Sequence, residues 1–258
     1  MRIKLVLLFI LFAGIANAQQ VRSNNFKSIK WSQEEIHSNY DNADPSTLKS
    51  DDIIAKYKPE IDQLLDPIGT TARKMDKYSP DYLLAYWAVD VMREFANDFM
   101  KKNRIKGKCD MSITNFGGIR ASLPEGEINS YDILTIFPFD NRVVILELEG
   151  KYLRELMENF AKRGRVEALS GVEIVINKKV LEKCLINGKP IKDDKIYKVA
   201  TIDFLLDGGD NVYALKYASK VIKTEKKLMD VYIDHIKSET AKGKVIDQKS
   251  DSRISIIK

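Results

Sequence analysis

Three short loops of the chain combine glycines or a proline with aromatic and polar side chains that can contact a ligand. They are Asn115-Phe116-Gly117-Gly118-Ile119-Arg120, Phe137-Pro138-Phe139-Asp140-Asn141 and Phe204-Leu205-Leu206-Asp207-Gly208-Gly209-Asp210. Adjacent glycines allow positive φ angles and a close approach of the backbone, and their amides can donate to an anion or a hydroxyl. An arginine can bind a carboxylate or a phosphate through two parallel hydrogen bonds. These residue types favour binding rather than bond-breaking chemistry.

Each loop by itself also has an ordinary structural interpretation. Glycine pairs usually form turns, an aromatic residue beside a proline is more often core, and Asn141 is typical of a turn. The set is more informative, because Phe139 and Phe204 can enclose a planar base at about 1 to 3 kcal/mol per stacked base. Asn and Asp side chains such as Asp210 can bind base edges or ribose hydroxyls, and Arg120 can bind a negative group. Together the loops predict a nucleoside site.

Predicted helices and strands alternate around these loops. Apolar residues recur at helical spacing over 53–65 and 80–100, and Ser79 with Pro80 forms a suitable cap and first turn for the second of these helices. We expect a helical turn at 131–137, helices at 150–161 and 226–236, and strands at 111–114, 142–149, 172–176, 197–202 and 254–257. Asn187-Gly188 predicts a tight hairpin turn. The alternation predicts an α+β fold with a mixed β-sheet covered by helices.

The first residues have the pattern of an export signal. Arg2 and Lys4 give a positive start, an apolar core follows over 5–15, and Ala16-Asn17-Ala18 is typical of a cleavage site. This core is shorter than the roughly 20 residues that a membrane-spanning helix needs. We therefore expect cleavage near Ala18, a polar arm over 19–50, a main domain over 51–258, and a periplasmic or secreted protein without a membrane anchor.

Composition and missing motifs exclude several function classes. The formal charge of +5 is small and evenly spread along the chain, which argues against nucleic acid as a partner. The charge-dense stretch 223–227 is interpreted as a solvated face. The sequence has no Walker-type loop, dinucleotide fingerprint or Gly-x-Ser-x-Gly elbow. Cys109 and Cys184 lack metal-type spacing, and two free thiols are at least as compatible with the sequence as one disulfide.

The order of these motifs resembles the C-terminal, substrate-recognition domain of the 5'-nucleotidase and UDP-sugar hydrolase family. The resemblance covers residues 51–258 and is carried by 115–120, 137–141, Gly150 with its helix, 187–190 and 204–210. Several motifs in one order are more specific than any one of them. The chain departs from the family over 81–87, where the family usually has a Leu-Gly-Asn-Leu segment. Arg73, Lys74 and Lys77 are candidates for the basic group that precedes this segment.

The resemblance implies a role for each loop residue. Phe139 and Phe204 match the two phenylalanines that sandwich the base of the substrate, and Asp210 matches the Asp that holds the ribose hydroxyls. Asn115 and Asn141 match positions that contact the base. The implied substrate-binding set is completed by Arg120, on the ribose or phosphate side, and by the loop glycines Gly117, Gly118 and Gly209.

The bond-breaking chemistry of this family is expected outside the chain. In the family, two metals held by Asp, Asn and several His of a separate N-terminal domain hydrolyse the phosphate ester. This chain has two histidines, His37 and His235, and neither lies in an Asp-x-His or Gly-Asn-His motif. We expect the chain to bind a nucleoside or nucleoside 5'-phosphate, to bind no cofactor and to be inactive alone. The two divalent metals would belong to a separate metallophosphatase chain. The alternative is a stand-alone nucleoside-binding or protein-interaction module.

Overall fold

A computed structural model describes residues 45–78 and 81–257 of the chain. The predicted signal peptide and most of the predicted arm lie outside these residues. Helix α2 covers Pro45–Leu65, so it runs through the boundary predicted near Ser50, and the compact unit that holds the domain begins at Ala55. Large apolar side chains of α2 are exposed to solvent, namely Ile53, Ile54, Tyr57, Ile61 and Leu65.

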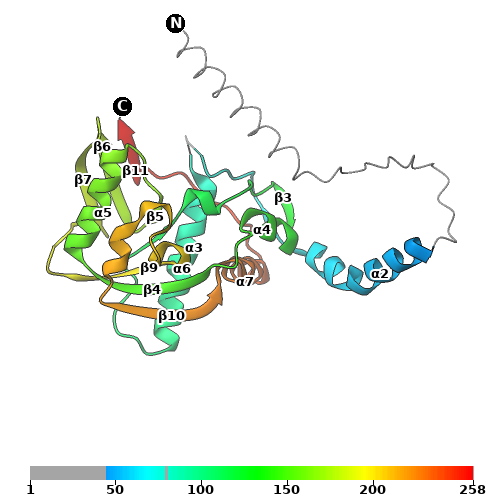
Figure 1. Cartoon of the computed structure of the whole chain (residues 1–258). Helices are drawn as coiled ribbons and strands as arrows, with labels where there is room; N and C mark the ends of the chain where they lie inside the picture. Colours follow the sequence, from blue (N-terminus) through cyan, green and yellow to red (C-terminus); the bar gives the residue numbers. More distant parts are fainter. Residues whose placement is uncertain (1–44, 79–80, 258) are drawn as a thin grey trace, which may run out of the picture. The chain divides into compact units, whose positions relative to one another are not determined.

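The central sheet has five strands in the order β10-β4-β9-β2-β5 (Figure 1). Its strands are β2 (Met111–Thr114), β4 (Arg142–Glu149), β5 (Ala168–Ser170), β9 (Ile196–Ile202) and β10 (Lys220–Lys227). β2 and β9 are parallel, whereas the other neighbouring pairs are antiparallel. The sheet is therefore mixed, as predicted.

Two smaller sheets accompany the central one. The first has four strands in the order β11-β6-β7-β8, which are Ile254–Ile257, Val172–Asn177, Val180–Ile186 and Lys189–Pro190. The predicted hairpin is present, because Ile186 pairs with Lys189 across Asn187 and Gly188, and both turn residues have positive φ. The second is an antiparallel ribbon of β1 (Pro67–Thr71) and β3 (Gly126–Asn129).

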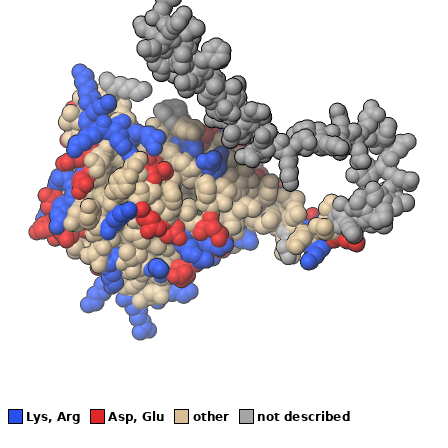
Figure 2. Space-filling model, viewed as in Figure 1, with Lys and Arg blue, Asp and Glu red and all other residues tan. Residues whose placement is uncertain are grey.

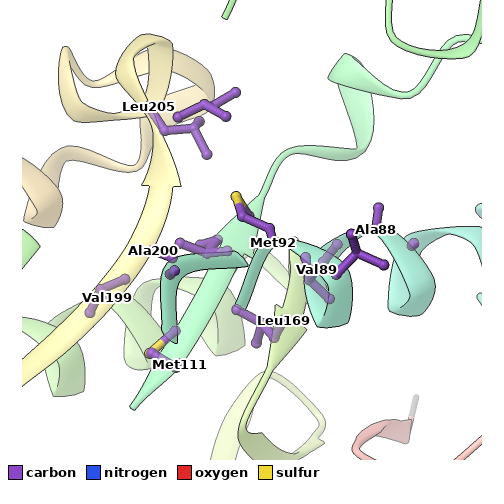
Figure 3. Packing of buried hydrophobic residues seen from close by; sticks show 14 of the residues in the cluster. Ala88, Val89, Met92, Met111, Leu169, Val199, Ala200 and Leu205 are labelled. Atoms are coloured by element: carbon purple, nitrogen blue, oxygen red, sulfur yellow. The ribbon is translucent and has the colours of Figure 1, made fainter. Parts of the chain in front are cut away.

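Helices cover these sheets. They are α3 (Leu83–Lys102), α4 (Ser130–Ile136), α5 (Gly150–Arg163), α6 (Asp203–Leu206) and α7 (Leu228–Ala241), with short 3-10 turns at Phe116–Gly118, Gly209–Asn211 and Tyr213–Tyr217. α3 packs on β2, β5 and β9, and α5 packs on β4 and on the four-stranded sheet. Figure 3 shows the core between α3 and the central sheet, formed by fully buried side chains that include Val89, Met92, Met111, Leu169 and Ala200.

The predicted elements between residues 111 and 257 are confirmed to within a few residues, and the structure corrects the start of one earlier helix and adds a strand, β10. The helix predicted from 80 begins at Leu83, after Tyr82, which has a φ of 51°; its predicted cap at 79–80 lies outside the described residues. The stretch 223–227 belongs to β10, for which no strand was predicted, and its Lys223 and Glu225 are exposed, in agreement with a solvated face. Because β10 is an edge strand, charged side chains can alternate along it while its backbone pairs with β4.

The thiols and the surface agree with the remaining sequence observations. Cys109 is buried and Cys184 lies within β7, and both are free thiols. Figure 2 shows acidic and basic side chains interspersed on the face in view. Within residues 45–78 and 81–257, no helix is long and apolar enough to cross a membrane.

Candidate functional site

The topology of the central sheet brings the three sequence-predicted loops to one end of it. Ser112 of β2 pairs with Ala200 of the parallel strand β9, so the loops that follow these two strands leave the sheet on the same side. β4 runs in the opposite direction, and its Val143 pairs with Ile202 at the end of β9. The loop that precedes β4 therefore reaches this end as well. The carboxyl ends of parallel strands are a common location for ligands.

Asn115 connects the first loop to the third. Its side chain is buried, and its Nδ2 donates to Oδ2 of Asp210 over 2.5 Å. Its Oδ1 is also buried and has no hydrogen-bond partner among the described residues. The glycines of the loop make room for this amide. A Cβ added at Gly118 would lie 2.8 Å from Oδ1 of Asn115, and one at Gly117 would lie 3.3 Å from both Nδ2 of Asn115 and Oδ2 of Asp210.

Lys77 holds the first loop from outside. Its ammonium group donates to the carbonyl oxygen of Phe116 over 2.9 Å and also to that of Ile119. The two other basic candidates have different partners, since Arg73 pairs with Asp247 and Lys74 with Asp76. Of the three residues considered for the upstream basic position, Lys77 thus contacts the loop. It does so by binding backbone oxygens.

The two phenylalanines of the second loop, Phe137 and Phe139, have different environments, which the sequence alone did not show. α4 ends at this loop and begins with a capping box, in which Asn129 and Asp132 each accept a backbone N–H of the other over 2.9 Å. Phe137, at the end of α4, is buried and belongs to the core, whereas Phe139 is 47% exposed. The guanidinium carbon of Arg120 lies 5.9 Å from the centre of the Phe139 ring. Phe139 thus has a surface available for a ligand.

A small pocket lies beside Phe139. It is lined by Thr114, Gly118, Phe137, Phe139, Asn141, Ile202 and Leu228. Three of these residues belong to the sequence-predicted set, and they come from both the first and the second loop. Asn141 is half-buried at the start of β4, so its amide can reach the pocket while its backbone carbonyl accepts the Leu228 N–H over 2.9 Å.

In the third loop, the exposed ring of Phe204 packs against Gly209. Phe204 is 45% exposed, and a Cβ added at Gly209 would lie 2.4 Å from Cε1 of this ring. The position therefore requires a glycine for steric reasons. Asp210 is half-buried and adopts a φ of 50°, which is uncommon for a residue with a side chain.

Sequence reasoning missed Glu167, a buried carboxylate at the same end of the sheet. Its Oε2 accepts the N–H of Phe116 over 2.9 Å, and its Oε1 faces the guanidinium groups of Arg163 and Arg165. The sequence did contain a signal for it: Glu167 follows Arg163 by four residues and Arg165 by two, and it directly precedes the apolar strand β5. Arg163 also donates to the backbone oxygen of Asp210 over 3.1 Å.

The His, Cys and acidic side chains in the described part of the chain bear on whether it could hold a metal or a nucleophile. No group of three or more His, Cys, Asp or Glu side chains there could hold a metal ion, so the two metals that the family resemblance implies do not fit these residues. His235 lies in α7, with Nδ1 3.6 Å from Glu94, and burial lowers its pKa. His37 lies outside the described residues. Burial also raises the pKa of Cys109 and of Cys184 to about 11, so neither is an activated nucleophile.

Comparison with known proteins assigns this arrangement to a family. The family model for the 5'-nucleotidase C-terminal domain matches residues 67–217, which include all three loops and Glu167. The chain belongs to the 5'-nucleotidase C-terminal domain family. This confirms the resemblance and the α+β fold predicted from the motifs. The match ends before β10, α7 and β11, and it begins after α2.

Relatives of this 5'-nucleotidase-type domain are larger proteins. A UshA protein from Yersinia enterocolitica is 31% identical over 106 residues, which is 40% of this chain and 19% of that protein. An apyrase from Tabanus yao is 30% identical over 149 residues, covering 49% of this chain and 27% of the apyrase. The chain thus corresponds to about a fifth to a quarter of the length of these curated relatives.

Solved structures share the fold. The 5'-nucleotidase precursor from Thermus thermophilus superposes with a TM-score of 0.66 at 21% identity, over 82% of this chain and 43% of that one. The NAD nucleotidase of Haemophilus influenzae superposes with a TM-score of 0.52 at 20% identity, over 84% of this chain and 41% of that one. At these identities the likeness concerns the fold. The roles of the individual site residues remain predictions.

Proposed function

We propose that this chain is the substrate-recognition part of a 5'-nucleotidase and binds a nucleoside or nucleoside 5'-phosphate at the end of its central sheet. The observation that carries the proposal is the convergence of the three loops at this end, where the hydrogen bond between Asn115 and Asp210 joins the first loop to the third. Two half-exposed phenylalanines, Phe139 and Phe204, flank the same end of the sheet. A family domain with this content is suited to a planar base attached to a polar sugar.

In the proposed binding mode, the base stacks between Phe139 and Phe204. Each ring has an exposed surface, and aromatic stacking is worth about 1 to 3 kcal/mol per base in nucleic-acid binders. Asn141 lies beside Phe139 and lines the same pocket, so its amide is placed to bind the edge of the base. Asn115 is buried, and its Nδ2 already donates to Asp210. We therefore propose that Asn115 holds the Asp210 carboxylate in place, in addition to making the base contact that the family resemblance implies.

The polar end of the ligand is bound by Asp210 and Arg120. Asp210 accepts from Asn115 with one carboxylate oxygen, which leaves its other oxygen and further lone pairs for ribose hydroxyls. Arg120 is exposed beside Phe139, and the one hydrogen bond of its guanidinium within the described residues joins Nη1 to the carbonyl oxygen of Gly117 over 3.3 Å. Most of its donors are therefore free for a phosphate.

We further propose that a separate metallophosphatase chain supplies the hydrolytic step. The sequence has two histidines, and the described residues hold no cluster of metal-ligating side chains. This chain then contributes binding and orientation: the stacked base and the held ribose fix the position of the phosphate beside Arg120. The pattern of the first 18 residues supports export, so we place both chains in the periplasm or outside the cell.

Two measurements test these proposals separately. Titration of the purified chain with adenosine and AMP tests binding, and the absence of saturable heat for both would contradict it. Affinity purification of the tagged chain from its native host, followed by an AMP hydrolysis assay with divalent metal, tests the division of labour. The recombinant chain alone should release no phosphate, whereas the co-purified material should. Turnover by the chain alone would contradict the division, and binding without any co-purified hydrolase would favour a stand-alone nucleoside-binding module.

A further inference from the structure

Glu167 occupies an unusual position for a carboxylate, buried against the first loop of the proposed site. Its side chain is 0% exposed, and it directly precedes β5, whose Ala168 pairs with Thr114 at the end of β2. Glu167 therefore lies beneath the loop that follows β2. A buried carboxylate without compensating partners is costly, so a chain retains one where its contacts are needed.

The two oxygens of Glu167 point to different structural partners. Oε2 accepts the backbone N–H of Phe116 over 2.9 Å and so holds the first loop. Oε1 lies 3.4 Å from Nη2 of Arg163 and 3.2 Å from Nη2 of Arg165. The carboxylate thereby joins the first loop to the end of α5, where Arg163 is the last helical residue.

Arg163 continues the connection to the third loop. Its other terminal nitrogen, Nη1, donates to the backbone oxygen of Asp210 over 3.1 Å. Asp210 and Asn211 both have positive φ, at 50° and 62°. Two consecutive residues with side chains in this region are unfavourable, and the surrounding structure must hold them there. Arg163 is fitted for this task because its planar guanidinium can bind two groups in fixed directions.

We propose that Glu167 and Arg163 form a brace that positions the Asp210 loop and the Asn115–Arg120 loop relative to each other. The brace works through backbone atoms, so Glu167 and Arg163 are positioning residues and do not contact the ligand. Its importance for ligand binding rests on the proposed function, whereas its effect on the loops does not. Arg165 is the matched control, since it contacts the same oxygen of Glu167 but is 68% exposed and, within the described residues, makes no hydrogen bond to Asp210.

Hydrogen exchange of the ligand-free chain tests the brace directly. In Arg163→Ala, we expect amides of residues 208–213 to exchange faster by about fivefold or more, because the loop loses its external hold. Arg165→Ala should leave the same amides within about twofold of the wild-type rate. Arg163→Lys retains the charge beside Glu167, but its single ammonium group replaces the two separate nitrogens with which Arg163 contacts Glu167 and Asp210. It should therefore loosen 208–213 and spare 115–120. Glu167→Gln should loosen both segments.

The outcomes separate a brace from a general structural role. Equal exchange at 208–213 in Arg163→Ala and the wild type would overturn the proposal, and so would equal loosening by Arg165→Ala. If Glu167→Gln does not fold, the three arginine variants still decide the question. Circular dichroism and thermal unfolding of every variant show whether the fold is retained.

Adenosine titrations then relate the brace to the site. Arg163→Ala should weaken adenosine binding by about tenfold, and it should weaken 2',3'-dideoxyadenosine binding by no more than about twofold, because that ligand lacks the hydroxyls assigned to Asp210. Equal losses for both ligands would contradict the link between the brace and ribose recognition. If the wild-type chain binds neither ligand, the proposed function fails, and the exchange data still decide whether the brace exists.

Discussion

Nδ2 of Asn115 lies 2.5 Å from Oδ2 of Asp210, which joins two loops that are 95 residues apart in the sequence. Asn115 directly follows β2, a strand inside the central sheet, and its side chain is buried. The hydrogen bond therefore anchors the carboxylate of Asp210 to the buried centre of the fold. This anchoring leads to the first prediction.

Asn115→Asp should destabilise the chain at neutral pH by about 1 to 3 kcal/mol, because it replaces the donor by a second carboxylate at hydrogen-bond distance. Repulsion raises the pKa of one carboxyl of the pair above its unfolded value. The penalty is therefore present above that raised pKa and disappears as the pH falls and one carboxyl becomes protonated. Urea unfolding at about pH 7.5 and about pH 5 measures the difference.

The control for this variant is Asn177→Asp. Nδ2 of Asn177 also donates to a carboxylate, Oε1 of Glu182, over 2.7 Å, but in the four-stranded sheet, where Glu182 is exposed and Asn177 is half-buried. Asn177→Asp should lower the free energy of unfolding by less than about 1 kcal/mol, and it should not change adenosine binding. An equal penalty in both variants would show that the bond between Asn115 and Asp210 has no special structural weight.

Gly209→Ala should weaken adenosine binding as much as removal of the Phe204 ring. The backbone of Gly209 is compatible with alanine, but the new Cβ would lie 2.4 Å from the ring and must displace it. Gly69→Ala is the matched control. Its Cβ would lie 2.6 Å from Cγ2 of Ile236, so it overpacks β1 against α7, away from the three loops. Calorimetric titration with adenosine should show reduced affinity in Gly209→Ala. Gly69→Ala should be less stable than the wild type but bind adenosine with wild-type affinity. Unchanged affinity in Gly209→Ala would argue against Phe204 as a wall of the site.

Arg120→Ala should distinguish the phosphate from the nucleoside. We expect AMP to bind about tenfold more weakly, while adenosine stays within about twofold of the wild-type affinity, because Arg120 is assigned to the phosphate side. Arg154→Ala serves as control, because it changes the total charge by the same amount. Arg154 lies away from the site loops and pairs with Asp193 at a distance of 2.8 Å. Parallel losses for AMP and adenosine would contradict the assignment of Arg120.

Cys109 and Cys184 should remain thiols in the purified chain. Burial raises the pKa of both to about 11, so both are protonated at neutral pH and react slowly. We expect mass spectrometry after alkylation in denaturant without reductant to find two modified cysteines. Alkylation of the native chain at neutral pH should be much slower. A non-reduced chain that is lighter by two hydrogens would show a disulfide that the free thiols of this structure exclude.

Local patterns in the sequence were sufficient for much of the fold and of the site. Glycine pairs, aromatic residues and the strand before each loop are encoded within a few residues, so the three loops could be recognised individually. Their convergence depends on strand order, which local patterns do not contain. The ordered resemblance to the family supplied that information before the structure did, and the register of β2, β4 and β9 now shows its physical basis.

The parts that sequence reasoning missed depend on tertiary context. β10 was obscured because an edge strand can carry a charged, solvated sequence. Glu167 was missed because an acidic residue between basic ones is usually solvated, and its burial becomes visible only when β5 is placed beside β2. Phe137 and Phe139 are two residues apart, and only the direction in which α4 ends makes one core and the other exposed.

The most direct measurement is a calorimetric titration with adenosine of the wild type, Phe204→Ala and the control Tyr213→Ala. Tyr213 is also exposed, at 57%. Its ring lies against Gly208, which directly precedes Gly209, the glycine packed against the Phe204 ring. We predict saturable binding to the wild type, a loss of about fivefold or more in Phe204→Ala from the removed stacking, and wild-type affinity in Tyr213→Ala. No binding to the wild type, or equal affinity in the wild type and Phe204→Ala, would contradict nucleoside recognition at this site.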